Sequence, residues 1–366
     1  MAYIVSVGTS LPKNEMDQEK TVEFAKEMFQ DSFKDINRLL KSFKNGGIKK
    51  RQFAESLDWY KETHTFQEKN EQFIYHAVRQ GAEAVVNCLS DEEFLSEAVP
   101  VEVIDAIFFI SSTGIATPSI DARIMNILPF KESTKRIPIW GLGCAGGAAG
   151  LSRAFEYCSA YKTAKVLVLA VELCSLTFQK DDVSKSNLIG TSLFADGIAC
   201  ALIAGEEALV SIPTRLKALP KIEASRSSFM KQSEDVMGWD IRDNGLYVIF
   251  SRDIPGIISD WLKPNVMLFL NEHNVSLNEI THFMAHPGGK KILDAYEESL
   301  GLGAKALLPS KEVLINHGNM SSVTVLYVIR EFLHKQSQKC GEKGLIGALG
   351  PGFCSEMLLV EWEEPA

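Results

Sequence analysis

Short apolar runs that alternate with glycine-rich turns and helical segments constrain the fold of this chain more than any other feature. Residues 106–111, 165–173 and 197–204 each form such a run, with the length of a strand and the composition of one buried on both faces. A helical pattern over 65–89 precedes the first run. Strands of this kind belong to sheets that helices cover on each side. The chain is therefore predicted to have an α/β fold.

The second half of the chain repeats this order of elements. An apolar run at 282–286 ends in a glycine turn, and a helix is expected over about 290–300. Each half then places a glycine turn at the start of an apolar helix, at Cys144 in the first half and at Asn319 in the second. The repetition predicts an internal duplication, with two similar halves packed face to face.

The length of the chain favours the same organisation. Its 366 residues exceed the size at which one hydrophobic core usually stops growing, so two closely packed cores are expected. The stretch 206–227, which carries Pro213 and Pro220, looks irregular and is the predicted boundary. The N-terminal half is taken as 1–215 and the C-terminal half as 216–366.

Composition argues against several classes of protein. A formal net charge of −9 disfavours a general nucleic-acid-binding protein, although 41–51 is locally basic. No apolar run reaches the ~18 residues that span a bilayer, and the N-terminus lacks the features of a signal peptide. A cytoplasmic protein with no membrane span is therefore expected. The seven cysteines are scattered and include no CxxC pair, which disfavours a disulfide framework and a zinc site.

The stretch 141–150, GLGCAGGAAG, places Cys144 at the start of a predicted helix. The positive end of a helix dipole stabilises a thiolate, so the pKa of a thiol there is expected to be lowered. The small residues that follow let the helix lie close to its neighbours and leave room for an acyl chain beside the sulfur. Cys144 is therefore the candidate nucleophile, and an inert buried thiol is the alternative interpretation.

The same stretch contains GxGxxG between a predicted strand at 136–140 and a helix, which is the outline of a dinucleotide site. It lies far from the N-terminus, outside the first βα unit, and a dinucleotide turn does not need a cysteine. A GxGxxG match is a weak signal by itself, so nucleotide binding is kept as an alternative only.

Two further glycine turns carry side chains that suit catalysis. His286 ends a predicted strand in AHPGG, and Asn319 begins a predicted helix in GNMSS. Taken singly, each has an ordinary interpretation, as a hydrogen-bonded core histidine and as a helix N-cap. Together with Cys144 they form a set in which an imidazole can activate a thiol, and an imidazole and an amide can stabilise an oxyanion.

These motifs resemble the chalcone and stilbene synthase family, the type III polyketide synthases, nearly from end to end. AHPGG and GNMSS in this order and spacing are highly specific to that family. The resemblance also covers IVSVGT at 4–9, IKKR at 48–51, GCAGG around Cys144, GTSLFADG at 190–197, DIPG at 253–256 and GPG at 350–352.

The resemblance implies a thiolase-like five-layer αβαβα fold and a homodimer. It implies an acyltransferase that condenses malonyl-CoA, with loss of carbon dioxide, onto a starter acyl group held on Cys144. His286 would then be the base that pairs with the thiol, and Asn319 its partner in holding the thioester carbonyl. Lys49 and Lys50 would meet the CoA phosphates. No metal or other cofactor is implied, because the coenzyme A thioesters are the substrates.

The resemblance also implies a set of substrate-binding residues. Phe194 matches the gatekeeper between the CoA tunnel and the reaction cavity. Val248 stands where the plant enzymes carry a second gating phenylalanine, and Cys174 where they carry a threonine. Thr117 stands where they place a methionine that reaches across the dimer. The remaining predicted substrate-binding residues are Thr113, Thr177, Ser321, Gly350 and Pro351.

Bacterial members of this family often take long-chain fatty acyl-CoA starters and release alkylpyrones, and the small Val248 is compatible with such a chain. The predicted function is iterative condensation followed by cyclisation to an alkylpyrone or a related product. Two alternatives stay open. One is a ketoacyl-ACP synthase III-like enzyme that condenses once, which GNMSS disfavours. The other is a non-catalytic thiolase-fold partner subunit, which the intact Cys144, His286 and Asn319 disfavour.

Overall fold

The computed structural model describes residues 1–251, 254–303 and 305–365, so Asp253 of the DIPG element lies outside the described residues. Within that part of the chain, nine strands join in the order β11-β12-β13-β8-β1-β7-β6-β4-β5. Their bounds are β1 (Ala2–Ser10), β4 (Ala106–Ser111), β5 (Lys135–Trp140), β6 (Lys165–Leu173), β7 (Asp196–Gly205), β8 (Leu219–Phe229), β11 (Ile280–Ala285), β12 (Lys343–Gly350) and β13 (Cys354–Glu363).

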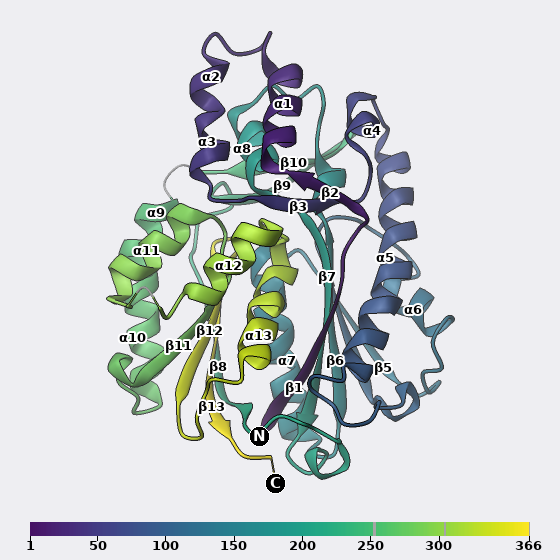
Figure 1. Ribbon diagram of the computed structural model, residues 1–366, viewed down its shortest axis with the longest axis vertical. Coiled ribbons are helices and arrows are strands. Elements are labelled where there is room, and N and C mark those ends of the chain that lie inside the picture. Colours follow the sequence, from purple (N-terminus) through teal and green to yellow (C-terminus); the bar gives the residue numbers. More distant parts are fainter. Residues whose placement is uncertain (252–253, 304, 366) are drawn as a thin grey trace.

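The strands form two walls that meet along a short junction. There β1 of the first half pairs with β8 of the second, through Ala2 with Ile222 and Tyr3 with Lys221. In Figure 1 the walls diverge from this junction, and α7 (Gly146–Ala160) and α13 (Thr324–Lys335) lie between them. Both chain ends lie at the foot of the junction.

The two walls repeat one pattern of strand pairing. In the first half β4 runs parallel to β6, and β6, β7 and β1 follow in antiparallel pairs. In the second half β11 runs parallel to β12, and β12, β13 and β8 follow in antiparallel pairs. The predicted duplication is therefore confirmed in the topology. The halves differ after β4 and β11, because a short helix (Ile120–Met125) and then β5 follow β4, whereas α11 (Lys290–Leu300) and α12 (Leu308–His317) follow β11.

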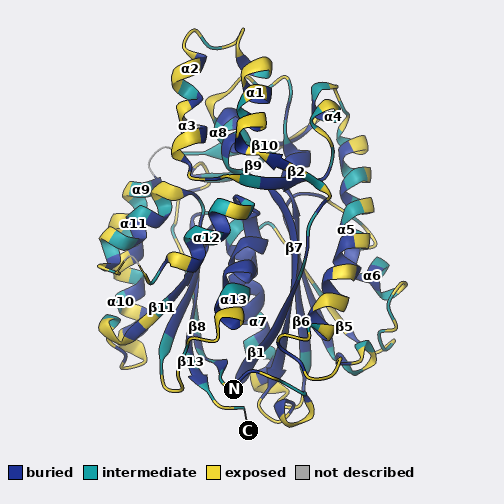
Figure 2. Cartoon of the chain, viewed as in Figure 1, coloured by how far each residue is buried: buried dark blue, intermediate teal, exposed yellow. Residues whose placement is uncertain are grey.

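Helices cover the outer face of each wall. The first wall is covered by α5 (Phe66–Ser90) and α6 (Ile120–Met125), and the second by α10 (Lys263–Glu272) and α11. The central α7 and α13 are buried along most of their length, as Figure 2 shows. This is the predicted five-layer αβαβα arrangement, and it leaves one place, between the walls, where both halves contribute to a site.

The helix expected over 65–89 is α5, and its local chemistry explains where it begins. The Thr65 hydroxyl accepts a hydrogen bond from the Glu68 N–H, and the Glu68 carboxylate accepts one from the Thr65 N–H, which is a complete capping box. The helix then buries a stripe that includes Phe73, Ala77 and Gly81 against the first wall.

Small residues at the start of α7 bring the two halves into contact. A Cβ atom on Gly147 would lie 2.1 Å from the Ser322 carbonyl oxygen, and one on Gly146 would lie 3.2 Å from Ser322 Cβ and 2.6 Å from Ile110 Cγ2 of its own half. A larger residue at either position would therefore force its neighbours to move. Because Ser322 lies in the short helix η7 (Ser321–Val323) that precedes α13, this contact holds the Cys144 turn beside the Asn319 turn.

A cap lies over the upper ends of both walls in Figure 1. It consists of α1 (Gln18–Phe29), α2 (Ile36–Leu39) and α3 (Lys41–Asn45), and it has its own small apolar core, formed by Ala25, Phe29, Ile36, Leu40, Phe43 and Leu188. Beside the cap are α8 (Lys185–Leu193) and two two-stranded antiparallel sheets, β2 (Asn14–Asp17) with β3 (Lys50–Phe53) and β9 (Met237–Arg242) with β10 (Gly245–Phe250).

The stretch 206–227 is only partly irregular, because β8 begins at Leu219 and runs through its second part. Pro220 lies within this strand, opposite Trp362 of β13, and the pairing of β8 with β1 starts one residue later. A proline there leaves no unpaired N–H toward β1. The boundary between 215 and 216 falls in the connection between β7 and β8 and stays a prediction. None of the described helices has the length and apolar content needed to span a membrane.

Candidate active site

Cys144 lies in a tight turn at the amino end of α7. The turn is the short helix η2 (Gly143–Ala145), in which Gly143 has a φ of +46° that favours glycine. Gly350 and Pro351, both predicted to bind substrate, pack against this turn instead. A Cβ atom on Gly143 would lie 2.7 Å from Pro351 Cδ, and one on Gly350 would lie 2.6 Å from Ala145 Cβ. The two residues therefore support the nucleophile turn from behind.

Asn319 is fixed through both its backbone and its side chain. Its N–H donates to the Leu193 carbonyl (2.9 Å), and its own carbonyl accepts from the Ala195 N–H (2.9 Å). Its side-chain amide donates to the Gly288 carbonyl (3.1 Å). The Ser321 N–H donates to Asn319 Oδ1 (2.9 Å). Asn319 is therefore not the N-cap of the following helix, which is Met320, and its side chain instead closes a local turn and holds the glycine turn that follows His286.

His286 follows β11 directly and is 2% exposed. Its backbone N–H donates to the Gly347 carbonyl (2.8 Å), which fixes the end of the strand. Neither ring nitrogen has a hydrogen-bond partner among the residues that the structure describes. Burial lowers the pKa of the imidazole to about 3, so the ring is neutral and offers one N–H donor and one basic nitrogen.

The pKa of Cys144 is raised, whereas its position at a helix start predicted that it would be lowered. Burial of the thiol raises its pKa to about 12, and the nearby Glu172 carboxylate adds to the rise. Hydrogen bonds from the side chains of Ser321 and Asn319 favour the thiolate and offset part of this effect. The resting site therefore holds a neutral thiol and a neutral imidazole. When the proton passes from sulfur to nitrogen, the two charges form together and attract each other in a poorly solvated site.

Asn319 thus links the Cys144 thiol to the glycine turn that follows His286. Asn319 acts on the Cys144 sulfur on one side and binds the carbonyl of Gly288 on the other. An added Cβ on Gly288 would lie 3.8 Å from His286 Nε2, so this turn lies directly against the imidazole. A buried thiol, imidazole and amide in this arrangement suit acyl transfer through a covalent thioester.

Glu172, at the end of β6, was not identified from the sequence, although it lies behind the site. Its carboxylate is fully buried and accepts hydrogen bonds from the Ser112 N–H (3.0 Å), the Thr113 hydroxyl (2.9 Å) and the Ser322 hydroxyl (2.6 Å). Burial raises the pKa of this carboxyl to about 7, and the hydrogen bonds oppose that rise. Glu172 therefore joins the first half to the second beneath Cys144. Thr113, predicted to bind substrate, is one of its donors.

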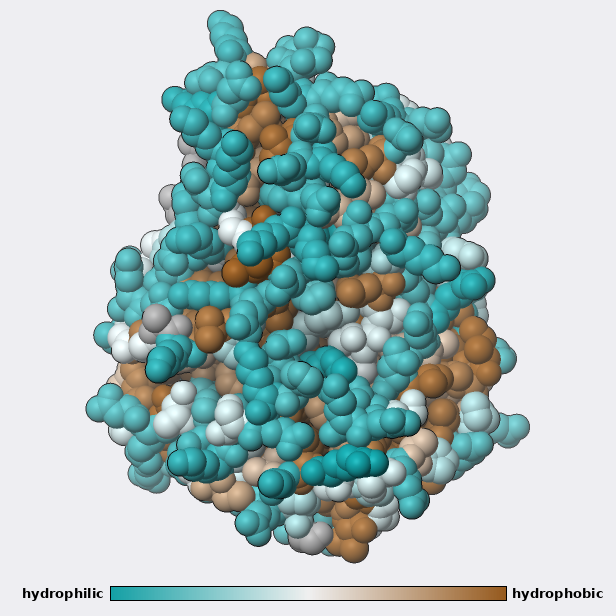
Figure 3. Space-filling model, in the orientation of Figure 1, coloured by the Kyte–Doolittle hydropathy of each residue, from teal (hydrophilic) through white to brown (hydrophobic). Residues whose placement is uncertain are grey.

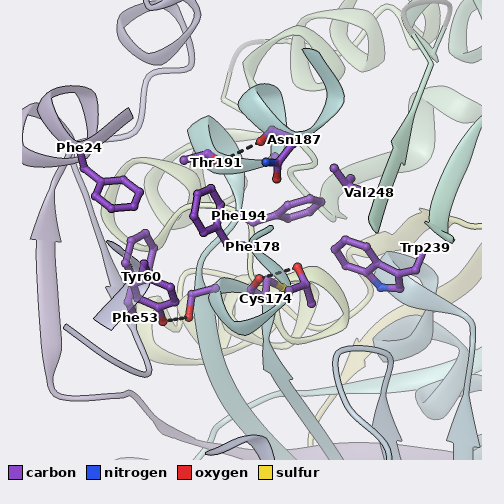
Figure 4. A pocket seen from close by; sticks show the side chains of 13 residues that line it. Phe24, Phe53, Tyr60, Cys174, Phe178, Asn187, Thr191, Phe194, Trp239 and Val248 are labelled. Carbon is purple, nitrogen blue, oxygen red and sulfur yellow. Dashed lines mark hydrogen bonds between the residues drawn. The ribbon is translucent and has the colours of Figure 1, made fainter. Parts of the chain in front are cut away.

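Four of the predicted substrate-binding residues line one cavity, which Figure 4 shows. Phe194, Val248, Cys174 and Thr177 all lie on it, and its volume is about 40 Å³. Trp239, which the sequence did not indicate, stands with Val248 at one side of the cavity. The ring centroids of Trp239 and Phe194 lie 5.6 Å apart. Phe24, Phe53 and Tyr60 stand at the opposite side of the view, so the lining is aromatic at both ends.

A second and larger cavity, of about 700 Å³, lies between the cap and the glycine turn after His286. In Figure 3 apolar atoms show between the cap and the body below it, on a face that is otherwise mostly hydrophilic. None of the described lining residues is acidic, and the basic ones are Arg38, Lys41, Lys185, Lys290 and Lys291. Such a rim suits a ligand with several phosphate charges.

The predicted phosphate-binding lysines are not part of this lining. Lys49 is exposed, and its backbone N–H donates to the Ile315 carbonyl (2.8 Å). Lys50 forms a surface ion pair with Glu15 (3.0 Å). Lys49 lies just before β3, and Lys50 is its first residue. The pairing of β3 with β2 fixes the direction in which the Lys50 side chain points. The basic side chains of the larger cavity are therefore different ones from those that the sequence indicated.

The two other predicted residues lie apart from these cavities. Ser321 has a left-handed φ of +48° and is nearly buried beside Cys144, whose thiolate its side chain favours. Thr117 is exposed on the surface loop before α6 and does not reach the site within the chain. Two glycines of the GxGxxG match pack against protein atoms, Gly143 against Pro351 and Gly146 against Ile110, whereas Gly141 has none within 4 Å of the Cβ position. No group of three or more His, Cys, Asp or Glu in the described part of the chain could hold a metal ion.

The fold and this site together define an acyltransferase of the thiolase-like condensing enzymes. Two family models match the chain, chalcone and stilbene synthases, N-terminal domain, over residues 1–207 and chalcone and stilbene synthases, C-terminal domain, over residues 221–362. The chain therefore belongs to the chalcone and stilbene synthase family and is a type III polyketide synthase. This assignment removes the dinucleotide-binding and carrier-protein-dependent alternatives, and a non-catalytic role has no support.

Three similar proteins illustrate the relationship. A Bacillus subtilis (strain 168) protein that is provisionally named chalcone synthase is 59% identical over the full length of both chains. The alpha-pyrone synthesis polyketide synthase-like Pks18 of Mycobacterium tuberculosis is 27% identical and covers 99% of this chain and 91% of its own. The crystal structure of 1,3,6,8-tetrahydroxynaphthalene synthase from Streptomyces coelicolor A3(2) superposes with a TM-score of 0.91 at 27% identity, covering 99% of each chain.

Proposed function

We propose that this enzyme loads a long-chain fatty acyl group from acyl-CoA onto Cys144, extends it with malonyl-CoA and releases an alkylpyrone or a related product. The observation that supports the long chain is the lining of the smaller cavity, which is mostly apolar and aromatic and leads from Phe194 toward the core of the cap. The Mycobacterium tuberculosis relative, whose name concerns alpha-pyrone synthesis, agrees with this proposal.

In the first step the Cys144 sulfur attacks the thioester carbonyl of the starter, and His286 accepts the thiol proton. The tetrahedral oxyanion is stabilised by N–H donors that are already fixed in place, including the second amide N–H of Asn319, since the first one binds Gly288. The carbon–sulfur bond to CoA then breaks, and His286 returns the proton to the departing CoA thiolate. The starter is left as a thioester on Cys144.

In the extension step malonyl-CoA loses its carboxylate as carbon dioxide, and the electron pair remains as an enolate on the thioester. A neutral imidazole N–H and the Asn319 amide can both donate to the enolate oxygen. The low pKa of His286 keeps the ring neutral and so preserves this donor role. The enolate carbon then attacks the thioester carbonyl on Cys144, the bond from that carbon to the Cys144 sulfur breaks, and the sulfur leaves as the thiolate. The product is a β-ketoacyl-CoA two carbons longer, which returns to Cys144 by the loading step before the next extension. Malonyl and acyl CoA esters are the proposed partners, with no further cofactor.

The path of the acyl tail follows from the shape of the smaller cavity. Beyond Cys174 its lining includes Phe178, whose ring lies 5.6 Å from Phe24 of the cap and 6.4 Å from Tyr60. A further small cavity lies on the other side of Phe178 and Tyr60, which line both. A volume of about 40 Å³ holds little more than one water. A long tail must therefore turn these rings aside and pass between the cap and the body.

Replacing Phe178 with alanine is expected to shift the starter preference toward longer chains. The removed ring opens space for several methylene groups, and each buried methylene contributes about 0.8 kcal/mol. The ratio of kcat/KM for a sixteen-carbon starter to that for an eight-carbon starter should rise about tenfold. Phe33→Ala is the matched control, because Phe33 packs in the cap against Phe29 and lines no described cavity. An equal shift in both variants would contradict the proposed path.

The function is tested by supplying malonyl-CoA with a panel of acyl-CoA starters, with EDTA and no added cofactor, and identifying products by mass spectrometry. The proposal expects alkylated pyrones or related products from long-chain starters and little product from malonyl-CoA alone. An aromatic product formed efficiently from malonyl-CoA alone would favour a tetrahydroxynaphthalene synthase, the activity in the name of the structural relative. Efficient turnover with aromatic starters only would also overturn the proposal.

The homodimer implied by the resemblance is supported by the edge of the first wall. β5 is paired on one side with β4 and is the last strand in the order. Trp140 at its end is 49% exposed and Ile115 nearby is 45% exposed, and Thr117 lies on the same loop as Ile115. An open strand edge with apolar neighbours is a typical pairing surface. Light scattering should give a mass of about twice 40.5 kDa, and Trp140→Glu should lower it toward the monomer.

A further inference from the structure

We propose that Arg51 is a positioning residue that places Asn319 and Phe194 for catalysis by holding the carboxyl end of α8. This inference rests on the proposed function, because it assumes that Asn319 acts on the thioester and enolate oxygens. Arg51 lies in β3 and its side chain is completely buried. It is therefore out of reach of solvent and of the CoA rim, and its contacts are all with the protein.

The guanidinium of Arg51 binds the last turn of α8 from beneath. One amino group (Nη1) donates to the Phe194 carbonyl (2.8 Å), and the other (Nη2) donates to Gln18 Oε1 (2.8 Å). The Gln18 amide in turn donates to the Ser192 carbonyl (3.4 Å). Arg51 and Gln18 thus satisfy two carbonyls at the end of a helix, where intrahelical partners are missing. The positive charge also lies at the negative end of the helix dipole.

The same helix end is bonded to Asn319. The Leu193 carbonyl accepts from the Asn319 N–H, and the Asn319 carbonyl accepts from the Ala195 N–H, both at 2.9 Å. Arg51 also lies directly under the preceding residue, since a Cβ atom on Gly318 would lie 3.4 Å from Arg51 Cδ. The backbone on both sides of Asn319 is thus in contact with groups that Arg51 positions. The gatekeeper Phe194 is held through its own carbonyl.

The burial of this cation requires an explanation that packing does not give. The side chain of Arg51 donates hydrogen bonds to the Phe194 carbonyl and to Gln18, and its Nε atom has no hydrogen-bond partner in the described residues. Asp196 is the charged group that acts on it, from a position where Asp196 itself binds Ser175 and Ala54. Burial lowers the pKa of Arg51 to about 9. A leucine would fill such a space without the cost of burying a charge. The two hydrogen bonds and the positive charge therefore explain why an arginine occupies this position.

The test measures the decarboxylation of malonyl-CoA by the full-length enzyme, with the release of carbon dioxide as the readout. Arg51→Gln should lower kcat by about 10- to 100-fold, because a donor to the enolate is displaced. KM for malonyl-CoA should change by less than about threefold, since the CoA rim is untouched. Alkylation of Cys144 by iodoacetamide should fall by much less than kcat, because Ser321 still favours the thiolate when Asn319 is displaced. Arg51→Lys, which keeps the charge and one donor, should recover part of kcat.

Arg330→Gln is the matched control. Arg330 is also an arginine that donates to a backbone carbonyl, that of Val7, and it pairs with Asp91 at 2.6 Å, far along α13 from the site. It should lower the thermal unfolding temperature yet leave kcat and KM within about twofold of wild type. If Arg51→Gln fails to fold, Gln18→Ala carries the test. It removes the Nη2 partner and should lower kcat about threefold at unchanged KM.

Several outcomes would overturn the inference. These are a kcat of folded Arg51→Gln within threefold of wild type, an equal loss of kcat in Arg330→Gln, or an equal loss of Cys144 alkylation in Arg51→Gln. If the wild-type enzyme does not decarboxylate malonyl-CoA at all, the proposed function fails instead. The wild-type rate measured beside each variant therefore separates the two failures.

Discussion

Replacing Cys144 with alanine is expected to reduce product formation from acyl-CoA and malonyl-CoA by at least about 1,000-fold. The thiol is the group that would carry the acyl chain between condensations, and the Asn319 amide and the Gly350–Pro351 support are arranged around it. Intact-protein mass spectrometry should show an acyl adduct on the wild-type enzyme and none on the variant. The variant should still fold, because the change removes one sulfur atom from a turn that backbone packing defines.

Cys340→Ala serves as the control for this experiment. Cys340 is an exposed thiol near the start of β12, whereas Cys144 is partly buried at the site. The control should keep both the adduct and wild-type turnover. Undiminished turnover of Cys144→Ala would remove Cys144 from its proposed role. Peptide mapping would then show whether the neighbouring Cys174, whose pKa burial raises well above the usual range, carries the chain.

Asn319→Ala is expected to slow malonyl-CoA decarboxylation by about 100- to 1,000-fold, which is typical for the loss of one donor to a developing oxyanion. The change also removes the hydrogen bond to the Gly288 carbonyl, so the turn beside His286 loses a support. Stopped-flow measurement of carbon dioxide release gives the rate. The matched control is Asn316→Ala, because Asn316 is exposed and its side chain bonds only to its own helix, at the Glu312 carbonyl (3.0 Å). Equal rates in both variants would contradict the assignment.

The sequence predicted the fold well because the decisive signals were local. The strand runs, the capping box at Thr65 and the glycine turns after His286 and before Asn319 each specify an element from neighbouring residues. The duplication then followed from their order. β8 was partly missed because its start lies in a proline-containing stretch, and its pairing partners β13 and β1 are distant in the sequence.

The site was predicted less completely, for two physical reasons. The first is that Trp239 reaches the cavity through the pairing of β9 with β10, which sets it opposite Val248, and no local pattern marks that register. The basic rim likewise combines residues as far apart as Arg38 and Lys291. The second reason is burial. The helix-start position of Cys144 predicted a lowered pKa, but the layers around it exclude solvent and raise the pKa instead.

The close contact of Gly146 and Gly147 with the opposite half has a consequence for how such an enzyme can diversify. Any side chain at Gly147 would collide with the Ser322 carbonyl, so this contact between the halves leaves no room for a larger residue. Phe194, Val248 and Phe178 line the smaller cavity instead. Their side chains can be exchanged one at a time at modest cost in stability. New products should therefore arise by substitution of the residues that line the cavity. The contact between the halves, and the reaction that it supports, should stay the same.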